Sequence, residues 1–343
     1  MKRSVNPRLI KIAWPLLLLA LAVTFPLIFT NPALVNIAVF ALIFAGLATS
    51  WNIFSGYTGY TALGHTVFFG FGAYTMALIS INQHLDGGFG IFLLVPVAGV
   101  VAAIFAIPVG WVALRTRGHA FVVITLIFVF IFQLLAYNLR GITLGSAGLF
   151  LPSPGFGIDW FLLPYYYIGL AILIAALAVS WYIRSSRYGL WLLAIRDDED
   201  RAEGLGVRTG VSKLIAFVIS AFFVGMIGAM YAYFLGVVYP PYVFDPALSI
   251  TIVLMAFLGG VGTLSGPIIG AFILESAQQY FNIYAPTGYY QIFLGALFLI
   301  VMLLLPQGIV RSLGRLWKAW RVRRGAGGTP VAPERQPVVV EKG

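Results

Sequence analysis

The charged side chains that could do chemistry gather in one short segment of this chain. Residues 184–213 hold five of the eleven acids and six of the 21 lysines and arginines. At residues 197–200 the sequence reads Asp-Asp-Glu-Asp, with Arg196 before the run and Arg201 after it. Closely spaced carboxylates of this kind can bind a magnesium ion or present a charged surface to another protein.

The rest of the sequence argues against an enzyme active site. Membrane prenyltransferases bind magnesium diphosphate through two aspartate-rich motifs, whereas this chain has one contiguous run between two arginines. The chain has no G-x-x-x-x-G-K-[ST] loop for ATP. Its histidines, His65, His84 and His119, are scattered, and it has no cysteine. We therefore predict no catalytic residue, metal site or cofactor.

The elements on both sides of the acidic run are apolar segments of membrane length. Hydrophobic residues make up 61% of the chain and charged residues 9%, against about 25% charged in a soluble domain. A helix of about 20 apolar residues spans the roughly 30 Å hydrocarbon layer. Because lipid offers the backbone no hydrogen bonds, such segments must be helices. The predicted fold class is all-α, a polytopic membrane helix bundle.

The apolar stretches predict about ten membrane segments. The region 247–283 is too long for one crossing and is broken by the glycines between Gly259 and Gly266, so we expect two short segments there. Residues 1–22 also fit a signal peptide, but the apolar run continues through Phe29. The other crossings are predicted near 12–30, 33–54, 61–81, 91–114, 119–137, 163–183, 213–235 and 288–305.

The basic residues set the predicted orientation. Those before the first crossing place the N-terminus in the cytoplasm, and Arg115, Arg117 and the loop 184–213 then fall on the same side, with Arg140 outside. A net charge of +10 suits the anionic inner leaflet, so no nucleic acid is predicted as a partner. We divide the chain into a transmembrane domain (1–310), a basic interfacial helix (311–324) and a disordered cytoplasmic tail (325–343).

A carrier driven by an ion gradient would need an ionisable residue inside the membrane. Glu275 is the only carboxylate within a predicted crossing, and it lies near the end of a short segment. A largely uncharged path suits a zwitterionic solute with an apolar side chain. Because Glu275 is poorly placed for ion coupling, we expect the energy for transport to be supplied by a partner that binds the charged loop. An ion-coupled carrier is the alternative from a different functional class.

Blocks along the chain resemble the permeases of branched-chain amino acid ABC importers, specifically the LivM-type subunit. In the charged loop the match runs from 194 to 206, beginning Ala-Ile-Arg-Asp-Asp-Glu. The resemblance covers about residues 33–310. The other blocks follow in family order at Gly56–Gly59, Leu63–Tyr74, Arg115–Leu126, Gly145–Leu149, Leu258–Pro267 and Pro306–Gly308.

This resemblance implies a membrane-spanning permease subunit of an ATP-driven importer for branched-chain or other hydrophobic amino acids. In such importers the cytoplasmic loop docks in a groove of the ATPase subunit, whose closure tilts the membrane helices. The residues assigned to this contact by the resemblance are Arg196, Asp197, Asp198, Glu199, Ala202, Glu203, Leu205 and Gly206.

The third segment and the break at 259–266 are the predicted parts of the translocation path. Interrupted helices present amide groups to a substrate carboxylate. The third segment and the break at 259–266 occupy corresponding places in the two sets of segments 33–137 and 213–305, which suggests inverted repeats. The chain departs from the family at Tyr60 and Ala62, where Gln and Ser are usual, and at Leu144, where Gly is usual. The path candidates are Tyr57, Gly59, Tyr60, Gly64, His65, Phe68, Thr263 and Ser265.

The resemblance also implies the partners and the location. They are a homologous LivH-like permease subunit, two ABC ATPase subunits and a periplasmic or lipid-anchored substrate-binding protein, in the bacterial inner membrane with both termini cytoplasmic. Related permeases for urea or short amides share the same blocks, so this substrate class stays open. The outer residues predicted to steer the binding protein are Asp86, Arg140, Asp159 and Asp245.

Overall fold

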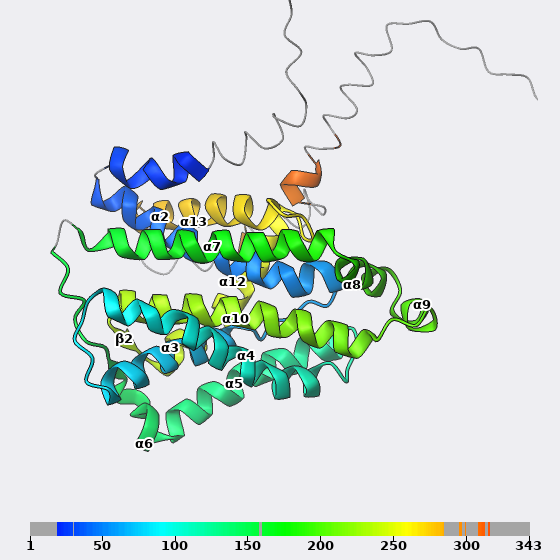
Figure 1. The fold of residues 1–343 in the computed structure, drawn as a ribbon, viewed down its shortest axis with the longest axis horizontal. Helices are drawn as coiled ribbons and strands as arrows, with labels where there is room; N and C mark the ends of the chain where they lie inside the picture. The colour runs from blue at the N-terminus through cyan, green and yellow to red at the C-terminus, as the bar shows by residue number, and fades with distance from the viewer. Residues whose placement is uncertain are drawn as a thin grey trace, which may run out of the picture.

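Long helices lie side by side, and two short ones project from one end of the bundle (Figure 1). This fold comes from a computed structural model of the chain, which describes residues 19–29, 31–157, 160–284, 295–296, 299, 308–312 and 315. The α-helices are Leu19–Ile28, α2 (Pro32–Trp51), α3 (His65–Asn82), α4 (Leu94–Ala113), α5 (His119–Asn138), α6 (Arg140–Thr143), α7 (Leu162–Ser185), α8 (Arg187–Asp197), α9 (Glu199–Gly204), α10 (Thr209–Leu235), α11 (Pro240–Val243), α12 (Pro246–Gly259) and α13 (Gly266–Tyr284). The other elements are the π-helix η1 (Asn52–Gly56), the 3-10 helices η2 (Phe89–Leu93) and η3 (Gly145–Ala147), and the strands β1 (Leu149–Phe150) and β2 (Val237–Val238).

The predicted all-α membrane bundle is confirmed, but the predicted number of about ten segments is not. Six segments of the described chain are long and apolar enough to cross a membrane. The described part of the first predicted crossing is the shorter helix Leu19–Ile28. The predicted crossing at 288–305 lies almost wholly outside the described residues, as do the predicted interfacial helix 311–324, apart from 311–312 and 315, and the tail 325–343.

The helices alternate in direction, which gives the bundle two ends of different character. One end, the ribbon end, carries α6, α11 and the antiparallel pair β1–β2, in which Leu149 lies opposite Val238. The other, the α9 end, carries α8, α9 and the loop between α4 and α5 (Figure 1). Arg117 of that loop pairs with Asp200 of α9 at 2.6 Å. The two loops predicted to share one side of the membrane therefore lie at one end.

Helix α10 forms the centre of the bundle and packs against α2, α3 and α4. Glycines allow this close approach: a Cβ on Gly72 of α3 would lie 1.9 Å from the carbonyl oxygen of Gly225 in α10. On the other side, a Cβ on Gly225 would lie 2.3 Å from Cβ of Ala102 in α4. Small residues let membrane helices pack backbone to backbone. A displacement of α10 is therefore transmitted directly to its three neighbours.

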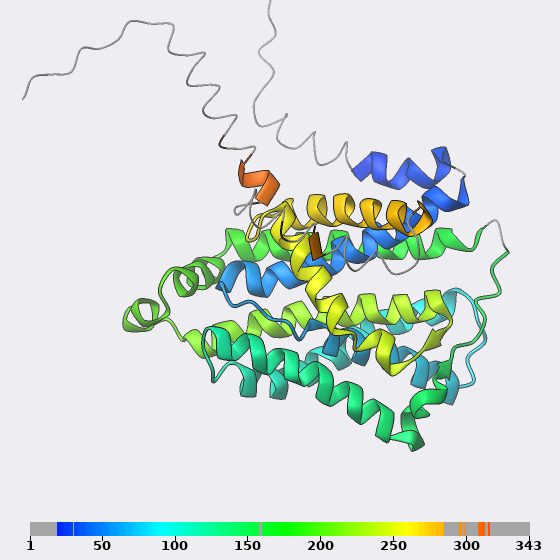
Figure 2. The ribbon, with the colours of Figure 1, turned by 180° about the vertical axis from the view of Figure 1, so that it is seen from behind.

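The predicted break at 259–266 is the turn of a helical hairpin. Helix α12 has 14 residues and α13 has 19, and α12 runs obliquely across the bundle in Figure 2. A Cβ on Gly259 would lie 1.7 Å from the carbonyl oxygen of Gly266, so the turn closes only around glycine. Helix α13 returns along α2, and the turn itself lies at the α9 end beside η1.

Candidate functional site

Helix α9 has clear start and stop signals. The Asp198 carboxylate accepts a hydrogen bond from the backbone N–H of Arg201 at 3.0 Å and so caps the helix N-terminus. After the helix, Gly206 adopts a φ of +88°, and its N–H donates to the Glu203 carbonyl at 2.9 Å. This left-handed conformation costs glycine little. A short helix therefore forms within the charged loop.

Most of α9 faces solvent. Ala202 is buried, whereas Asp200, Arg201 and Glu203 are exposed. Leu205, the residue after the helix, is 85% exposed. This part of the molecule presents a mixed-charge surface with one apolar side chain.

Glu199 turns the opposite way, into the bundle. Its carboxylate accepts a hydrogen bond at 2.6 Å from Lys213, near the start of α10, and a second from the Tyr60 hydroxyl. Lys213 also donates to the Tyr60 oxygen at 3.2 Å and lies 4.4 Å from the centroid of that ring. The side chains of Lys213 and Glu199 are only 2% and 11% exposed. We call Glu199, Lys213, Tyr60 and Arg117, which lies 3.8 Å from Glu199, the Glu199 network.

The electrostatics of this network favour an ionised Glu199. Burial alone raises the pKa of its carboxyl, but the hydrogen bonds from Lys213 and Tyr60 and the charges of Lys213 and Arg117 outweigh burial, so the pKa lies below its ordinary value. Burial, and then the bond to Glu199 and its charge, raise the pKa of Tyr60. The Tyr60 hydroxyl therefore stays protonated and donates a hydrogen bond to the carboxylate.

Arg117 extends the network to the surface. It pairs with Asp200 at 2.6 Å and lies 3.8 Å from Glu203, with 54% of its side chain exposed. Ion pairs this exposed contribute little stability. They instead hold the α4–α5 loop next to α9. The network borders a cavity of 510 Å³ lined by residues of 58–61, 118–122 and 195–199.

A second set of contacts joins η1 to the α12–α13 turn. The Asn52 side chain accepts from the N–H of Gly262 at 2.7 Å and donates to the carbonyl of Thr263 at 3.0 Å. Arg196, near the end of α8, donates to the carbonyl of Gly56 at 2.8 Å. Arg311 donates to the carbonyl of Val261 at 2.6 Å. Four segments that are separated in the sequence therefore meet at this end of the bundle: η1, α8, the α12–α13 turn and the segment that contains Arg311.

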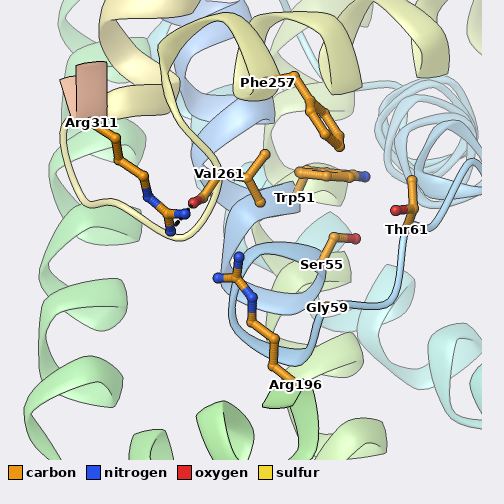
Figure 3. A pocket seen from close by; sticks show the side chains of 8 residues that line it. All are labelled: Trp51, Ser55, Gly59, Thr61, Arg196, Phe257, Val261 and Arg311. Carbon is orange, nitrogen blue, oxygen red and sulfur yellow. Dashed lines mark hydrogen bonds between the residues drawn. The ribbon is translucent and has the colours of Figure 1, made fainter. Parts of the chain in front are cut away.

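Between these segments lies a cavity of 320 Å³, which we call the two-arginine pocket (Figure 3). Arg196 and Arg311 reach into it from different elements, and the Trp51 ring forms part of its wall. The Trp51 indole N–H donates to the carbonyl of Ala62 at 2.8 Å and is thereby fixed. The lining residues are Trp51, Ser55, Gly59, Thr61, Arg196, Phe257, Val261 and Arg311.

The structure divides the predicted path residues into two groups. Tyr57, Gly64, His65 and Phe68 are buried within this chain. His65 Nε2 lies 2.7 Å from the Ser220 hydroxyl oxygen, and aromatic rings surround the imidazole. The second group lies at the α9 end and consists of Gly59, Tyr60, Thr263 and Ser265.

The predicted coupling residues also divide. Arg196 and Glu199 point into the bundle, toward the pocket and the network. Ala202 is buried under α9. The remaining residues are exposed or half-buried on the outer surface, namely Asp197, Asp198, Glu203, Leu205 and Gly206.

Three predicted outer residues lie at the ribbon end. Arg140 and Asp86 are exposed, and Asp245 caps α12 by accepting from the N–H of Ala247 at 2.8 Å. Asp159 lies outside the described residues. Leu144, where the resembled family usually has glycine, adopts a φ of +56°, a conformation that costs a β-carbon-bearing residue about 1–2 kcal/mol.

The sequence prediction missed the inward-facing contacts at the α9 end. Lys213 was placed at the edge of an apolar crossing, where a buried partner for it should have been sought. Asn52 was not singled out, although a polar amide inside an apolar segment is a comparable signal. Arg311 was assigned to a surface helix. None of these contacts could be paired from sequence spacing alone.

Comparison with known proteins gives consistent matches over most of the chain. Residues 33–302 match the family described as the permease component of branched-chain amino acid transport systems. The chain is 30% identical over 319 residues to the high-affinity branched-chain amino acid transport system permease protein LivM of Escherichia coli (strain K12), covering 85% of this chain and 73% of that protein. It is 28% identical over 282 residues to LivH of Salmonella typhimurium, covering 78% and 91%. No solved structure gives a significant match.

Proposed function

We propose a specific role within the family of branched-chain amino acid transport permease components, to which this chain belongs. The chain is a permease subunit and not itself an enzyme. It forms part of the path for branched-chain or other hydrophobic amino acids, and its motion is driven by ATPase subunits that bind the α9 end. The partners are a LivH-like permease, two ATPases and an external binding protein.

The observation that carries this proposal is the Glu199 network. It ties the first residue of α9 to Lys213 in α10 and to Tyr60 in the segment before α3. Because α10 packs tightly against α2, α3 and α4, a displacement of α9 reaches most of the bundle. An ATPase that binds the outer face of α9 would therefore move the membrane helices through the Glu199 network, without contacting these helices directly.

The surface proposed to bind the ATPase is the outer face of α9 and the turn after it. Leu205 is 85% exposed there, and Gly206 sets the turn that presents it. Asp197, Asp198 and Glu203 supply the surrounding charge. Arg196 and Glu199 act from inside by holding α8 and α9 against the bundle.

Transport by the assembled system tests this docking surface. The chain is reconstituted in proteoliposomes with its sister permease, ATPases and binding protein, and uptake of labelled leucine is measured with and without ATP. We expect Leu205→Ser to abolish ATP-dependent uptake while the chain still inserts and assembles with its sister permease. The matched control is Leu190→Ser, which changes an α8 residue that is 63% exposed. Equal uptake by wild type and Leu205→Ser contradicts the docking assignment.

The same assay decides between substrate and energy alternatives. Competition by urea or acetamide, with none by leucine or valine, would assign the chain to amide transport. Uptake without ATPase subunits, driven by a proton or sodium gradient, would favour a carrier. The described residue that such a carrier would use is Glu275, which is 2% exposed and has one carboxylate oxygen without a described hydrogen-bond partner. We expect Glu275→Gln to leave ATP-driven uptake intact.

The α9 end is proposed to face the cytoplasm and the ribbon end the exterior. The chain has no cysteine, so single cysteines can be introduced without background. In intact cells we expect an impermeant thiol reagent to label Asp86→Cys at the ribbon end and to miss Glu203→Cys in α9. The reverse pattern would contradict the orientation and, with it, the ATPase contact.

A further inference from the structure

The two-arginine pocket concentrates positive charge, and no acid among the described residues lines it. A Cβ placed on Gly262 would lie 2.4 Å from Nη1 of Arg196 and 3.2 Å from Nη2 of Arg311, so both guanidinium groups converge on the same turn. Figure 3 shows both side chains directed toward Val261 and its neighbours. Among the described residues, neither arginine forms an ion pair with an acid within 4.0 Å.

Both arginines have N–H donors that form no hydrogen bond with the described residues. Within the described chain, each guanidinium donates one hydrogen bond to a backbone carbonyl, that of Gly56 for Arg196 and that of Val261 for Arg311. A guanidinium has five N–H donors in a planar fork that fits a carboxylate. Burial, and then the charges of Arg196 and Arg184, lower the pKa of Arg311. An anion between the arginines would relieve this repulsion and satisfy the free donors.

The rest of the lining is suited to an apolar group. The rings of Trp51 and Phe257 lie with their centroids 6.2 Å apart, and Val261 adds an aliphatic side chain. The hydroxyls of Ser55 and Thr61 are the remaining polar side-chain groups of the lining. The volume of 320 Å³ lies at the lower end of the roughly 300–1,000 Å³ range of small-molecule sites. The pocket therefore combines an anion site with an apolar wall.

We propose that this pocket binds the carboxylate of a small aliphatic acid, and specifically the branched-chain amino acid that the transporter delivers to the α9 end. This rests on the proposed function. The carboxylate lies between Arg196 and Arg311, and the side chain packs against Trp51, Phe257 and Val261. Since no acid lines the described pocket to receive an ammonium group, recognition is by the carboxylate rather than the amine.

Equilibrium binding to the full chain tests the chemical class of the ligand. The protein is placed in phosphatidylcholine nanodiscs, and binding of labelled leucine is measured in competition with 4-methylpentanoate, 3-methylbutylamine and inorganic phosphate. We expect the aliphatic acid to compete about as well as leucine, and the amine and phosphate to compete at least tenfold less well. No leucine binding, or equal competition by phosphate, would overturn the proposal.

Variants locate the bound ligand. Arg311→Gln removes one charge-assisted contact with the ligand, so affinity should fall about tenfold or more. Arg201→Gln is the matched control, since it makes the same charge change on α9, where the side chain is 85% exposed. Val261→Phe keeps both charges but fills the pocket, and it should also reduce binding. Wild-type affinity in both Arg311→Gln and Val261→Phe contradicts the assignment.

Two further measurements separate this inference from its alternatives. If phosphatidylglycerol in the nanodiscs abolishes leucine binding, the anion in the pocket is a lipid headgroup and the inference fails. Uptake by the assembled complex separates it from the proposed function. ATP-driven leucine uptake without Arg311-dependent leucine binding removes only the pocket assignment, whereas absence of leucine uptake by the wild-type complex removes the proposed function.

Discussion

The Glu199 network and the two-arginine pocket lie at the same end of the bundle but handle charge in opposite ways. In the network, the carboxylate of Glu199 is met by Lys213 at 2.6 Å and by the Tyr60 hydroxyl. In the pocket, Arg196 and Arg311 converge without an acid among the described residues. In the network, the buried carboxylate and ammonium groups neutralise each other, as a structural contact requires. In the pocket, the two guanidinium groups have no acid partner among the described residues, as a binding site for an anion requires.

The two regions are joined by the backbone that links α8 to α9. Arg196 lies in the last turn of α8, and Glu199 is the first residue of α9. Between them, Asp198 has an extended conformation, with φ −161° and ψ 108°. An anion that repositions Arg196 would thus act next to the residue that holds α9 to α10. The proposed site of force transmission and the proposed ligand site therefore lie next to each other in one short segment.

Removing the acid of the Glu199 network should lower the unfolding free energy of the chain more than any other substitution considered. Glu199→Ala leaves the ammonium group of Lys213, which is 2% exposed, with only the Tyr60 hydroxyl as a described partner. Breaking a buried ion pair in this way costs about 3–5 kcal/mol, and the lower end applies because the network reaches solvent at Arg117. Thermal unfolding of the purified chain, followed by tryptophan fluorescence, measures this loss.

The control for this prediction is Glu203→Ala on the same helix. Its carboxylate is 63% exposed and lies 3.8 Å from Arg117, so the substitution should change stability by less than about 0.5 kcal/mol. Removing both partners, in Glu199→Ala with Lys213→Ala, should cost less than the sum of the single changes. Additive losses would show that the pair does not act as a tie.

A smaller effect is expected from Tyr60→Phe. This change removes the hydrogen bond to the carboxylate of Glu199 but retains the ring beside Lys213. A hydrogen bond to a charged group contributes about 1.5–3 kcal/mol. We expect a loss in that range and reduced ATP-driven uptake in the assembled transporter. Unchanged stability and uptake would mean that Lys213 alone holds Glu199.

Acid should loosen the network without affecting the pocket. The pKa of Glu199 is lowered from an ordinary value of 4.5, so its contribution to stability is complete above that value. It is lost as the pH falls through the lower pKa of the folded protein. The unfolding temperatures of wild type and Glu199→Gln should therefore differ most at about pH 7, and the difference should shrink as the pH falls below 4.5. A constant difference across this range would exclude ionised Glu199 as the source.

The bundle could be predicted because it depends on local sequence, and the helix within its charged loop depends on local signals in the same way. Apolar length sets the crossings, and Asp198 and Gly206 mark the ends of α9. The turn at 259–266 was likewise signalled by its glycines. At Leu144 the glycine that is usual in the resembled family indicated the backbone conformation, since Leu144 has a positive φ.

The network and the pocket could not be predicted because they are built from residues distant in the sequence. Tyr60 was interpreted as a change in the path, whereas its hydroxyl binds Glu199, 139 positions away. Asn52 binds a turn 210 positions away. Such pairs depend on which helices pack together, and a single sequence contains no signal for that. Charge predicts which end a residue occupies, but not whether it faces the bundle or a partner.

The smallest loss of stability is expected from a substitution in the two-arginine pocket. Arg311→Gln removes a charge that faces Arg196 and has no described acid to stabilise it, so relief of repulsion offsets loss of the bond to the Val261 carbonyl. The unfolding free energy should change by less than about 0.5 kcal/mol in the absence of ligand. In wild type, 4-methylpentanoate should raise the unfolding temperature, because a ligand stabilises the state that binds it, and in Arg311→Gln this rise should disappear. A loss as large as that of Glu199→Ala would mean that the pocket is a structural tie like the network.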